Sequence, residues 1–404
     1  MPAAHGLARC AAGWRKPRGK IDARGLTNRN QSGKRMKKII GDIGIGIGLA
    51  LACGLAHAQS SVTLYGLIDE AIRFQSSAAG NTVGINEGAV NGNRFGLKGV
   101  EELGGGTRAI FQLESGFNIA NGKSDQQGQL FGRFAWVGLQ SDRFGTVKLG
   151  RQYGGIYNFY AFNFDPIGGG NVNATDWSLF LVGIRFDNTL QYETDLGPVT
   201  LQVQHAFGGQ PGSAVSGSTS TASLIYRFGG GKLGIAGAQS KDGGGHKLLV
   251  GSLGGTYAWG SLALYLYGID ARRDAGFNVA AANSGGPLAN TSIVGNATTA
   301  SGPQGSARDD VFVRVGASWQ LAPQWRVIGS YAYDHANHVS PGRSGTTQTV
   351  YGIVDYLLSK RTDVYLEVDH SHLSGASVND PNGPLNFAGK ANNFGASLSL
   401  RTVF

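Results

Sequence analysis

The sequence predicts an all-β fold, a transmembrane barrel of sixteen antiparallel strands. Three observations lead to this fold class. Apolar and polar side chains alternate along many short segments, the connections between those segments are alternately short and long, and a segment typical of export precedes the first of them. A chain that spans a membrane without apolar helices must pair its backbone groups between strands, and a closed barrel leaves none of them unpaired.

The carboxy-terminal segment, residues 393–404, shows the alternation most clearly. Phe394, Leu398, Leu400 and Phe404 fall on one face, and the opposite face is mostly polar or small. A period of two residues is the period of a β-strand, and a single apolar face suits contact with lipid. A soluble β-sandwich also alternates, but it rarely ends on an aromatic carboxy-terminal residue.

The same pattern recurs along the chain and places sixteen strands. They are expected at 62–75, 93–101, 107–118, 130–141, 144–151, 186–195, 198–207, 220–228, 232–240, 248–258, 260–270, 309–321, 324–334, 348–358, 362–372 and 391–404. Tight turns alternate with longer connections rich in Gly, Ser, Asn and Thr, at 76–92, 119–129, 152–185, 208–219, 241–247, 271–308, 335–347 and 373–390. An even number of strands puts both termini in the periplasm, with short turns there and long loops outside the cell.

Aromatic residues are expected to form girdles at the two membrane interfaces. Eight of them fall near predicted strand ends: Tyr65, Trp136, Tyr192, Tyr257, Trp259, Trp319, Trp325 and Tyr356. Their amphipathic rings suit the headgroup level of a bilayer. No convincing amphipathic helix is found anywhere in the chain.

The amino-terminal residues are expected to be removed during export. Residues 1–35 are basic and lack periodicity, and a Met-Lys-Lys sequence at Met36 precedes an apolar run that ends in Ala-His-Ala at Ala58. This is the order of a secretory signal peptide. Two regions are therefore expected: an extension with a signal peptide over 1–58, and the barrel over 59–404. Met36 is the expected true start, and a genuine basic arm on a longer signal is the alternative.

Removal of this segment changes the charge balance. The whole chain has 35 Lys and Arg and 26 Asp and Glu, and the segment holds 11 and 2 of them, which leaves 24 of each and no net charge. The basic pI therefore belongs to the removed part, and nucleic-acid binding is not expected. Cys10 and Cys53 also lie there, so the barrel has no disulfide and no thiol nucleophile. Lipid attachment at Cys53 is the alternative.

Several segments in a fixed order resemble the general diffusion porins of Gram-negative outer membranes, in particular their β-proteobacterial branch. They are SVTLYG at 61–66, NRFGLKG at 93–99, AIFQLE at 109–114, GRFAWVGL at 132–139, LGRQY at 149–153, LSKRTD at 358–363, and the terminal Phe404. The resemblance spans the expected mature chain. Two departures are an unusually aromatic third long loop and Thr402, where the family more often has an aromatic residue or His.

The resemblance implies a homotrimer of sixteen-stranded barrels in the bacterial outer membrane, each with an inward-folded third loop. Acidic residues of that loop would face a basic wall across the narrowest part of the pore. In this sequence the loop is expected at 152–184, with Asp165 and Asp176 as its acids. The family's basic cluster would correspond to Arg94, Arg133 and Arg185.

Alternation supports part of this basic wall independently. In the second strand, the apolar neighbours Phe95 and Leu97 take the lipid face, so Arg94 and Lys98 point into the lumen. In the fourth strand, Phe134 and Trp136 are assigned to the lipid face, so Arg133 points inward as well. An arginine that faces hydrocarbon costs about 2–4 kcal/mol, whereas one that lines water does not. The alternative is that these arginines only brace the loop through salt bridges.

Arg151 differs from the other arginines. It shares its face with Val147 and Leu149, which are expected to point outward. It is therefore not a pore residue by alternation. The resemblance implies a place at the trimer interface for it.

These features predict a water-filled outer-membrane channel for passive diffusion of ions and small hydrophilic solutes, and not an enzyme. No catalytic residue, metal or cofactor is expected, and the partners are outer-membrane lipids, solutes and other copies of the chain. His370 and His372 share a strand face and are expected to be solvated, with a metal site as the alternative. A substrate-specific channel also stays open, because the third loop carries aromatics such as Tyr157 and Phe162.

Overall fold

The computed structural model describes residues 60–76, 80–170, 178–277, 298–299, 302–303, 306–380, 387 and 389–404. The chain divides into two units, Met1–His57 and Ala58–Phe404, and all described residues belong to the second. The predicted export segment 1–58 lies outside the described residues.

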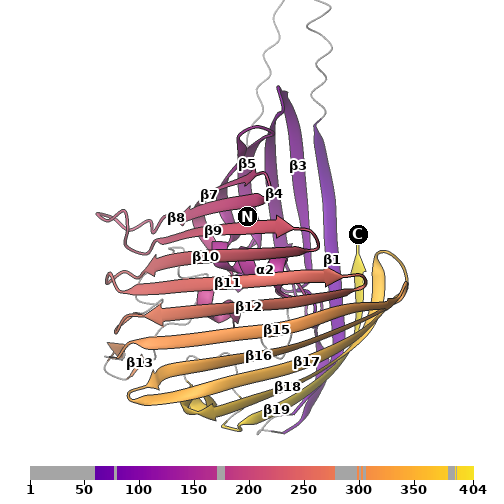
Figure 1. The fold of residues 1–404 in the computed structure, drawn as a ribbon, viewed down its shortest axis with the longest axis vertical. Helices are drawn as coiled ribbons and strands as arrows, with labels where there is room; N and C mark the ends of the chain where they lie inside the picture. The colour runs from indigo at the N-terminus through magenta and orange to yellow at the C-terminus, as the bar shows by residue number, and fades with distance from the viewer. Residues whose placement is uncertain are drawn as a thin grey trace, which may run out of the picture. The chain divides into compact units, whose positions relative to one another are not determined.

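Sixteen long strands of the described residues form the wall of the barrel (Figure 1). They are β1 (Ser61–Gln75), β3 (Arg94–Gly104), β4 (Thr107–Gly116), β5 (Phe134–Ser141), β6 (Gly145–Tyr153), β7 (Arg185–Leu196), β8 (Val199–Ala206), β9 (Thr219–Phe228), β10 (Gly231–Lys241), β11 (Lys247–Trp259), β12 (Leu262–Arg273), β15 (Arg308–Ala322), β16 (Trp325–Ser340), β17 (Arg343–Leu357), β18 (Thr362–Gly375) and β19 (Asn392–Val403). Each overlaps one predicted segment, so the predicted strands are confirmed.

The sheet closes on itself. Each strand pairs antiparallel with its neighbour in the chain, and β1 pairs with β19 from Leu67 opposite Val403 to Gln75 opposite Gly395. The backbones of Gly66 and Phe404 exchange two hydrogen bonds of 3.0 Å, so the terminal residue takes part in the closure. A short strand, β2 (Thr82–Glu87), pairs with the end of β1, while β3 pairs with its beginning. Closure removes the free sheet edges that lipid cannot hydrogen-bond.

The two faces of the wall have opposite chemistry. Along β18, Leu366 and Val368 are exposed on the outside, whereas Glu367 and Asp369 are buried on the inside. The other strands repeat this pattern, with exposed apolar side chains alternating with buried polar ones. Such a surface is unfavourable in water and suited to lipid, because the solvent of the outer face is then hydrocarbon.

The predicted aromatic girdle is confirmed in part. Tyr257, Trp259, Trp319, Trp325 and Tyr356 are exposed near the short turns. The assignment of Tyr65 and Trp136 to this girdle is wrong, because the Tyr65 hydroxyl donates to the interior Glu114 at 2.8 Å and Trp136 lines an interior cavity.

The long connections are shorter or more ordered than predicted in several places. Residues 335–347 were expected to be a loop, but β16 runs to Ser340 and β17 begins at Arg343. The sequence predicted no helix, yet the connection between β6 and β7 contains α2 (Gly155–Phe164) and α3 (Ser178–Val182). Smaller elements are η2 (Gln126–Gly128), β13 (Thr298–Thr299), β14 (Gly302–Pro303) and η5 (Ala376–Asn379).

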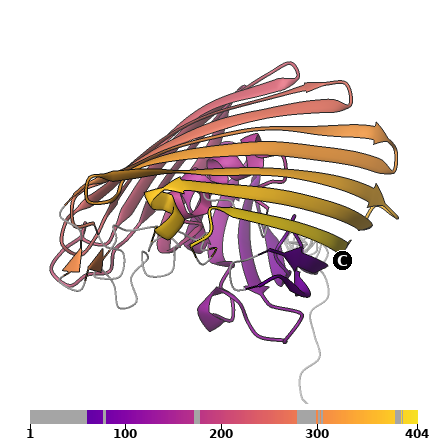
Figure 2. The same cartoon turned by 90° about the horizontal axis from the view of Figure 1, so that it is seen from below.

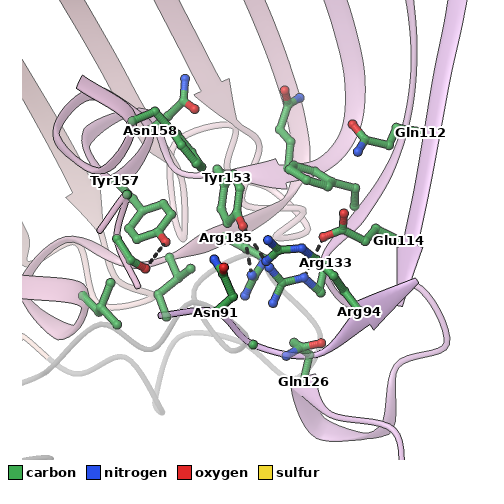
Figure 3. A pocket seen from close by; sticks show the side chains of 18 of the residues that line it. Asn91, Arg94, Gln112, Glu114, Gln126, Arg133, Tyr153, Tyr157, Asn158 and Arg185 are labelled. Atoms are coloured by element: carbon green, nitrogen blue, oxygen red, sulfur yellow. Dashed lines mark hydrogen bonds and ion pairs between the residues drawn. The ribbon is translucent and has the colours of Figure 1, made fainter. Parts of the chain in front are cut away.

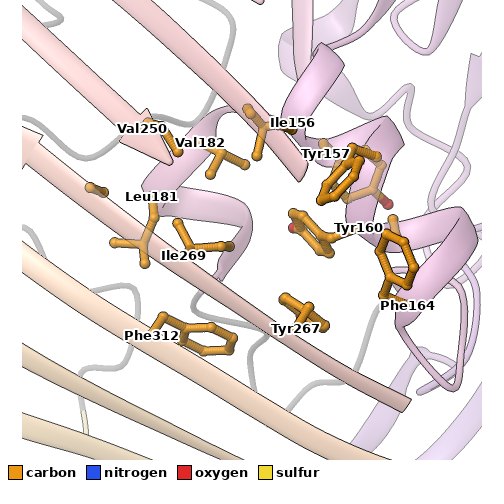
Figure 4. Packing of buried hydrophobic residues seen from close by; sticks show 14 of the residues in the cluster. Ile156, Tyr157, Tyr160, Phe164, Leu181, Val182, Val250, Tyr267, Ile269 and Phe312 are labelled. Atoms are coloured by element: carbon orange, nitrogen blue, oxygen red, sulfur yellow. The ribbon is translucent and has the colours of Figure 1, made fainter. Parts of the chain in front are cut away.

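Helix α2 packs against the inner face of β8 to β12 (Figures 1 and 2). Its buried aromatic side chains lie against inward-pointing wall residues such as Tyr267, Ile269 and Phe312 (Figure 4). Tyr160 stacks on Tyr267 with ring centroids 4.6 Å apart. Each large apolar side chain that is fully buried contributes about 1.5–3 kcal/mol relative to an exposed one. This cluster therefore fixes the loop inside the barrel, as the family resemblance implied.

Glycines of the wall make room for this helix. A Cβ atom added at Gly254 of β11 would lie 2.2 Å from the Phe164 ring, and one at Gly234 of β10 would lie 2.6 Å from the Phe159 ring. The aromatic rings of α2 therefore rest directly on the backbone of the wall.

Candidate functional site

A cavity of about 440 Å³ lies between the folded-in loop and strands β3 to β7. Three of its cations lie close to one another in Figure 3: Arg94 and Arg185 at the starts of β3 and β7, and Arg133 in the bend before β5. A fourth, Lys148, lies in the middle of β6. The loop contributes aromatic, aliphatic and small residues together with the amide of Asn158. The lining includes Glu87, Asn91, Arg94, Gln112, Glu114, Gln126, Arg133, Phe134, Trp136, Lys148, Tyr153, Tyr157, Asn158, Phe162, Arg185 and Gln191.

Arg133 is the best-anchored cation of the cavity. Its Nε donates to Glu114 Oε1 at 2.6 Å, and both side chains are almost fully buried. Its Nη2 donates to the hydroxyl of Tyr153 at 3.2 Å. The backbone N–H of Arg133 also donates to the Glu114 carbonyl at 3.1 Å. These bonds orient the guanidinium toward the cavity.

Arg185 and Arg94 stand beside it with fewer partners. Arg185 Nη2 donates to the Tyr153 hydroxyl at 3.4 Å, and its guanidinium lies 4.8 Å from the centroid of the same ring. Within the part of the chain that the structure describes, neither Arg94 nor Arg185 forms an ion pair with a carboxylate. Tyr153 thus holds two of three neighbouring guanidiniums, whose mutual repulsion in a low-dielectric setting favours a negative counter-charge.

The charge of the cavity follows from its lining. Four cations, Arg94, Arg133, Lys148 and Arg185, stand against two carboxylates, Glu87 and Glu114. The formal balance is therefore +2. Lys148 was not among the predicted site residues, although it alternates with the outward-facing neighbours on β6 and its parity could have revealed it. Its Nζ lies 5.1 Å from the centroid of the Trp136 ring.

Lys98 does not line this cavity. It shares a face with Arg94 on β3, as predicted, but its side chain is exposed and its Nζ lies 5.5 Å from the ring of Tyr65. The structure therefore separates Lys98 from the three arginines.

Asp165 does not face the arginine cluster either. Its Oδ2 accepts from Arg314 Nη1 of β15 at 2.7 Å, with both side chains almost fully buried, and from the Tyr267 hydroxyl at 3.3 Å. Its Oδ1 accepts from the backbone N–H of Ile167 at 2.9 Å. Asp165 thus ties the loop to the wall. The other predicted acid, Asp176, lies outside the described residues.

The predicted parity of the fourth strand is wrong. Phe134 and Trp136 line the cavity, whereas Val137 and Leu139 are exposed on the outer face. Arg133 still reaches the cavity because it precedes β5, which begins at Phe134, so strand alternation does not govern its direction.

Arg151 is absent from the cavity lining, as its parity predicted. Its Nη1 donates to Asp187 Oδ1 at 2.6 Å, and its Nε donates to the Gly132 carbonyl at 2.7 Å. These bonds connect β6 with β7 and with the bend before β5. Its place at a trimer interface stays a prediction.

Two further properties of the described residues bear on the site. None of their helices has the length and apolar character needed to cross a bilayer. Among the same residues, no group of three or more His, Cys, Asp or Glu side chains is arranged to hold a metal ion. His372 bonds to Asn392 instead, with Nδ1 and Oδ1 2.9 Å apart.

A closed sixteen-stranded barrel, apolar outside and charged inside, is the architecture of an outer-membrane β-barrel protein. The family model for Gram-negative porins matches residues 47–376. The chain belongs to this family, and its location is the bacterial outer membrane.

Curated relatives agree with this assignment over part of their length. An outer membrane porin protein of Bordetella pertussis is 41% identical over 163 residues, which is 36% of this chain and 42% of that protein. Outer membrane porin protein 32 of Delftia acidovorans is 39% identical over 109 residues, 26% of this chain and 30% of that protein. The chain thus spans less than half the length of these relatives.

Solved structures share the fold. An anion-selective porin from Comamonas acidovorans gives a TM-score of 0.68 at 21% identity and covers 86% of this chain and 100% of its own. The trimer form of OmpT, an outer membrane protein of Vibrio cholerae, gives 0.57 at 14% identity, with 85% and 99% covered. At these identities the likeness concerns the fold alone.

Proposed function

We propose that the chain forms a water-filled channel for passive diffusion of ions and small hydrophilic solutes, with a weak preference for anions, and that it is not an enzyme. The single observation that carries the preference is the cavity with four cations and two carboxylates. The pairing of Asp165 with Arg314 supports it, because a neutralised loop acid does not offset the arginines. A cation that enters such a passage meets a like-charge barrier.

The preference is weak because the excess is only two charges. At physiological salt the Debye length of about 8 Å screens charges away from the narrowest point. We therefore expect the preference to diminish as salt rises. The name of the Comamonas structure, an anion-selective porin, points in the same direction.

Purified protein in planar bilayers under a salt gradient tests this function. Ohmic single-channel conductance with a reversal potential of anion sign, largest at low salt, is expected. A cation-sign reversal potential at low salt would contradict the anion preference, and the absence of conductance would contradict the channel itself.

We also infer a homotrimer in which Arg151 lies near the subunit interface. Family membership and the trimer form of OmpT support this assembly. Cross-linking of the purified protein in detergent tests it, and a species that stays at monomer mass would contradict it.

Export is the remaining part of the proposal. We infer that residues 1–58 are removed and that the mature chain begins at Gln59, because an Ala-His-Ala sequence precedes Gln59. Intact mass of the protein from outer membranes tests this, and a mass that retains the segment or a lipid on Cys53 would contradict it.

A further inference from the structure

Among the aromatic side chains of α2, that of Phe162 is only partly covered by its neighbours. Tyr157, Phe159, Tyr160 and Phe164 of α2 are at most 5% exposed, whereas Phe162 is 51% exposed. Phe162 lines the cavity that holds the arginine cluster. An apolar ring left open to a polar, water-filled cavity is unfavourable by itself, because its apolar surface stays hydrated.

One side of the Phe162 ring is supported and the rest is open. Its centroid lies 5.4 Å from the ring of Tyr153 and 6.1 Å from that of Tyr157. Phe134 and Trp136 also line the cavity. The cavity therefore has an aromatic wall beside its cations, and rings prefer offset or edge-to-face partners at about 4.5–7 Å.

The cations next to this wall are suited to a carboxylate. Arg94 and Arg185 form no ion pair with a carboxylate of the described residues. A guanidinium presents a planar fork of donors that matches a carboxylate in two parallel bonds. Amide side chains of Asn91, Gln112 and Asn158 add further polar groups. The volume of about 440 Å³ falls within the range of about 300–1,000 Å³ for small-molecule sites.

We propose that this cavity is a weak binding site for planar aromatic carboxylates, with the carboxylate at Arg94 and Arg185 and the ring against Phe162. This rests on the proposed channel function and names the solutes that the channel retains best. An aliphatic carboxylate gains the charge contact but not the ring contact. Chloride, a single atom, gains neither the two parallel bonds of the fork nor the ring contact.

The size of the effect follows from ring contacts. An aromatic pair contributes about 0.5–1.5 kcal/mol beyond area burial, which corresponds to roughly a 2- to 12-fold change in affinity. We therefore expect benzoate to reduce the ion current at a concentration several-fold lower than acetate does. Cyclohexanecarboxylate, which is apolar but not planar, is expected to fall between them.

The test compares half-blocking concentrations of benzoate, cyclohexanecarboxylate and acetate in planar bilayers. Phe162→Ala is expected to lose the benzoate advantage, which is the lower half-blocking concentration of benzoate relative to acetate. Phe162→Leu is expected to keep the block by cyclohexanecarboxylate, but benzoate and cyclohexanecarboxylate should then block at equal concentrations. Phe144→Ala is the matched control, because Phe144 is an exposed phenylalanine in a short turn away from the cavity. It is expected to behave as the wild type.

Two outcomes would overturn the proposal. One is a wild-type channel that benzoate and acetate block equally, and the other is an undiminished benzoate advantage in both Phe162 variants. The reversal potential, recorded on the same membranes, distinguishes a failure of the aromatic-carboxylate site from a failure of the proposed function. An anion-sign potential without a benzoate advantage removes only the aromatic-carboxylate site, whereas a cation-sign potential removes the anion preference on which it rests.

Discussion

Glu87 is a carboxylate of the cavity whose charge changes near neutral pH. It lies in β2, outside the sixteen spanning strands, and lines the cavity. Burial raises the pKa of Glu87 to about 7. The backbone N–H of Asn93 and the Arg133 guanidinium lower this pKa, while Asp125 and Glu70 raise it further. At pH values above 7 the cavity therefore holds one more negative charge than at pH values below it.

We expect the anion preference to strengthen as pH falls from about 8 to about 6, because protonation of Glu87 takes the formal charge of the cavity from +2 to +3. The reversal potential under a salt gradient, recorded at both pH values, measures this. Glu87→Gln is expected to show the low-pH value throughout, and the exposed Glu101→Gln to keep the wild-type shift. An unchanged shift in Glu87→Gln would assign the titration to another group.

The sequence predicted the arginines of the site better than its acids. Arg94 starts β3, and Arg185 starts β7 directly after the loop, so their positions followed from local pattern and resemblance. The inward direction of Arg133 was predicted correctly, although the faces assigned to its strand were wrong. Arg133 lies just before β5, which begins at Phe134, so the alternation of that strand does not set its direction. Asp165 could not be assigned from local sequence, because its partner Arg314 lies 149 residues away.

At the scale of elements, the sequence missed α2 for a physical reason. A helix at a protein surface shows an apolar stripe and a polar face. Helix α2 buries side chains on most of its faces, including Ile156, Tyr157, Tyr160 and Phe164, and offers no polar face to detect. Its environment is the interior of the barrel, which no local pattern reveals. The inward direction of the loop came from family resemblance alone.

The ion pair between Asp165 and Arg314 ties this loop to β15. We expect Arg314→Gln to destabilise the protein by about 3–5 kcal/mol, because it leaves a buried carboxylate without its charge partner. Denaturant unfolding in detergent measures the change. The double variant Asp165→Asn with Arg314→Gln is expected to recover part of the loss, because the Asp165 carboxylate is then removed together with its charge partner.

The same pair of variants provides the outcome that would contradict this role. If Arg314→Gln alone is as stable as the double variant, the pair does not anchor the loop. In that case the aromatic cluster around Tyr160 and Tyr267 holds α2 in place by itself.

At the scale of the whole molecule, the alternation of apolar and polar residues predicted nearly all of the wall. It succeeds because each strand meets lipid on one side and water or protein on the other, so the period of two is seldom interrupted. The alternation failed at 335–347, where polar residues on both faces resemble a loop. In the structure β16 continues to Ser340 and β17 begins at Arg343. Beyond the membrane both faces of a strand meet water, and the pattern disappears.

The orientation of the barrel is a further prediction at this scale. We expect the connection between β8 and β9 to be outside the cell and the turn between β17 and β18 to be in the periplasm, because short turns face the periplasm in this architecture. Ala214→Cys and Lys360→Cys place a thiol at an exposed position of each. A membrane-impermeant thiol reagent applied to whole cells should label only the first. Labelling of only the second would reverse the orientation.

The central claim is that the arginine cluster lines the conducting path and sets its preference. The most direct measurement is the reversal potential, under a salt gradient, of the double variant Arg94→Ser with Arg133→Ser. The control is the double variant Arg143→Ser with Arg272→Ser, which removes two exposed arginines that are not among the cavity-lining residues. The cavity variant is expected to shift toward cations and to conduct more, because it loses two positive charges and two large side chains, while the control keeps the wild-type value. A cavity variant whose reversal potential equals that of the wild type would show that these arginines do not line the path.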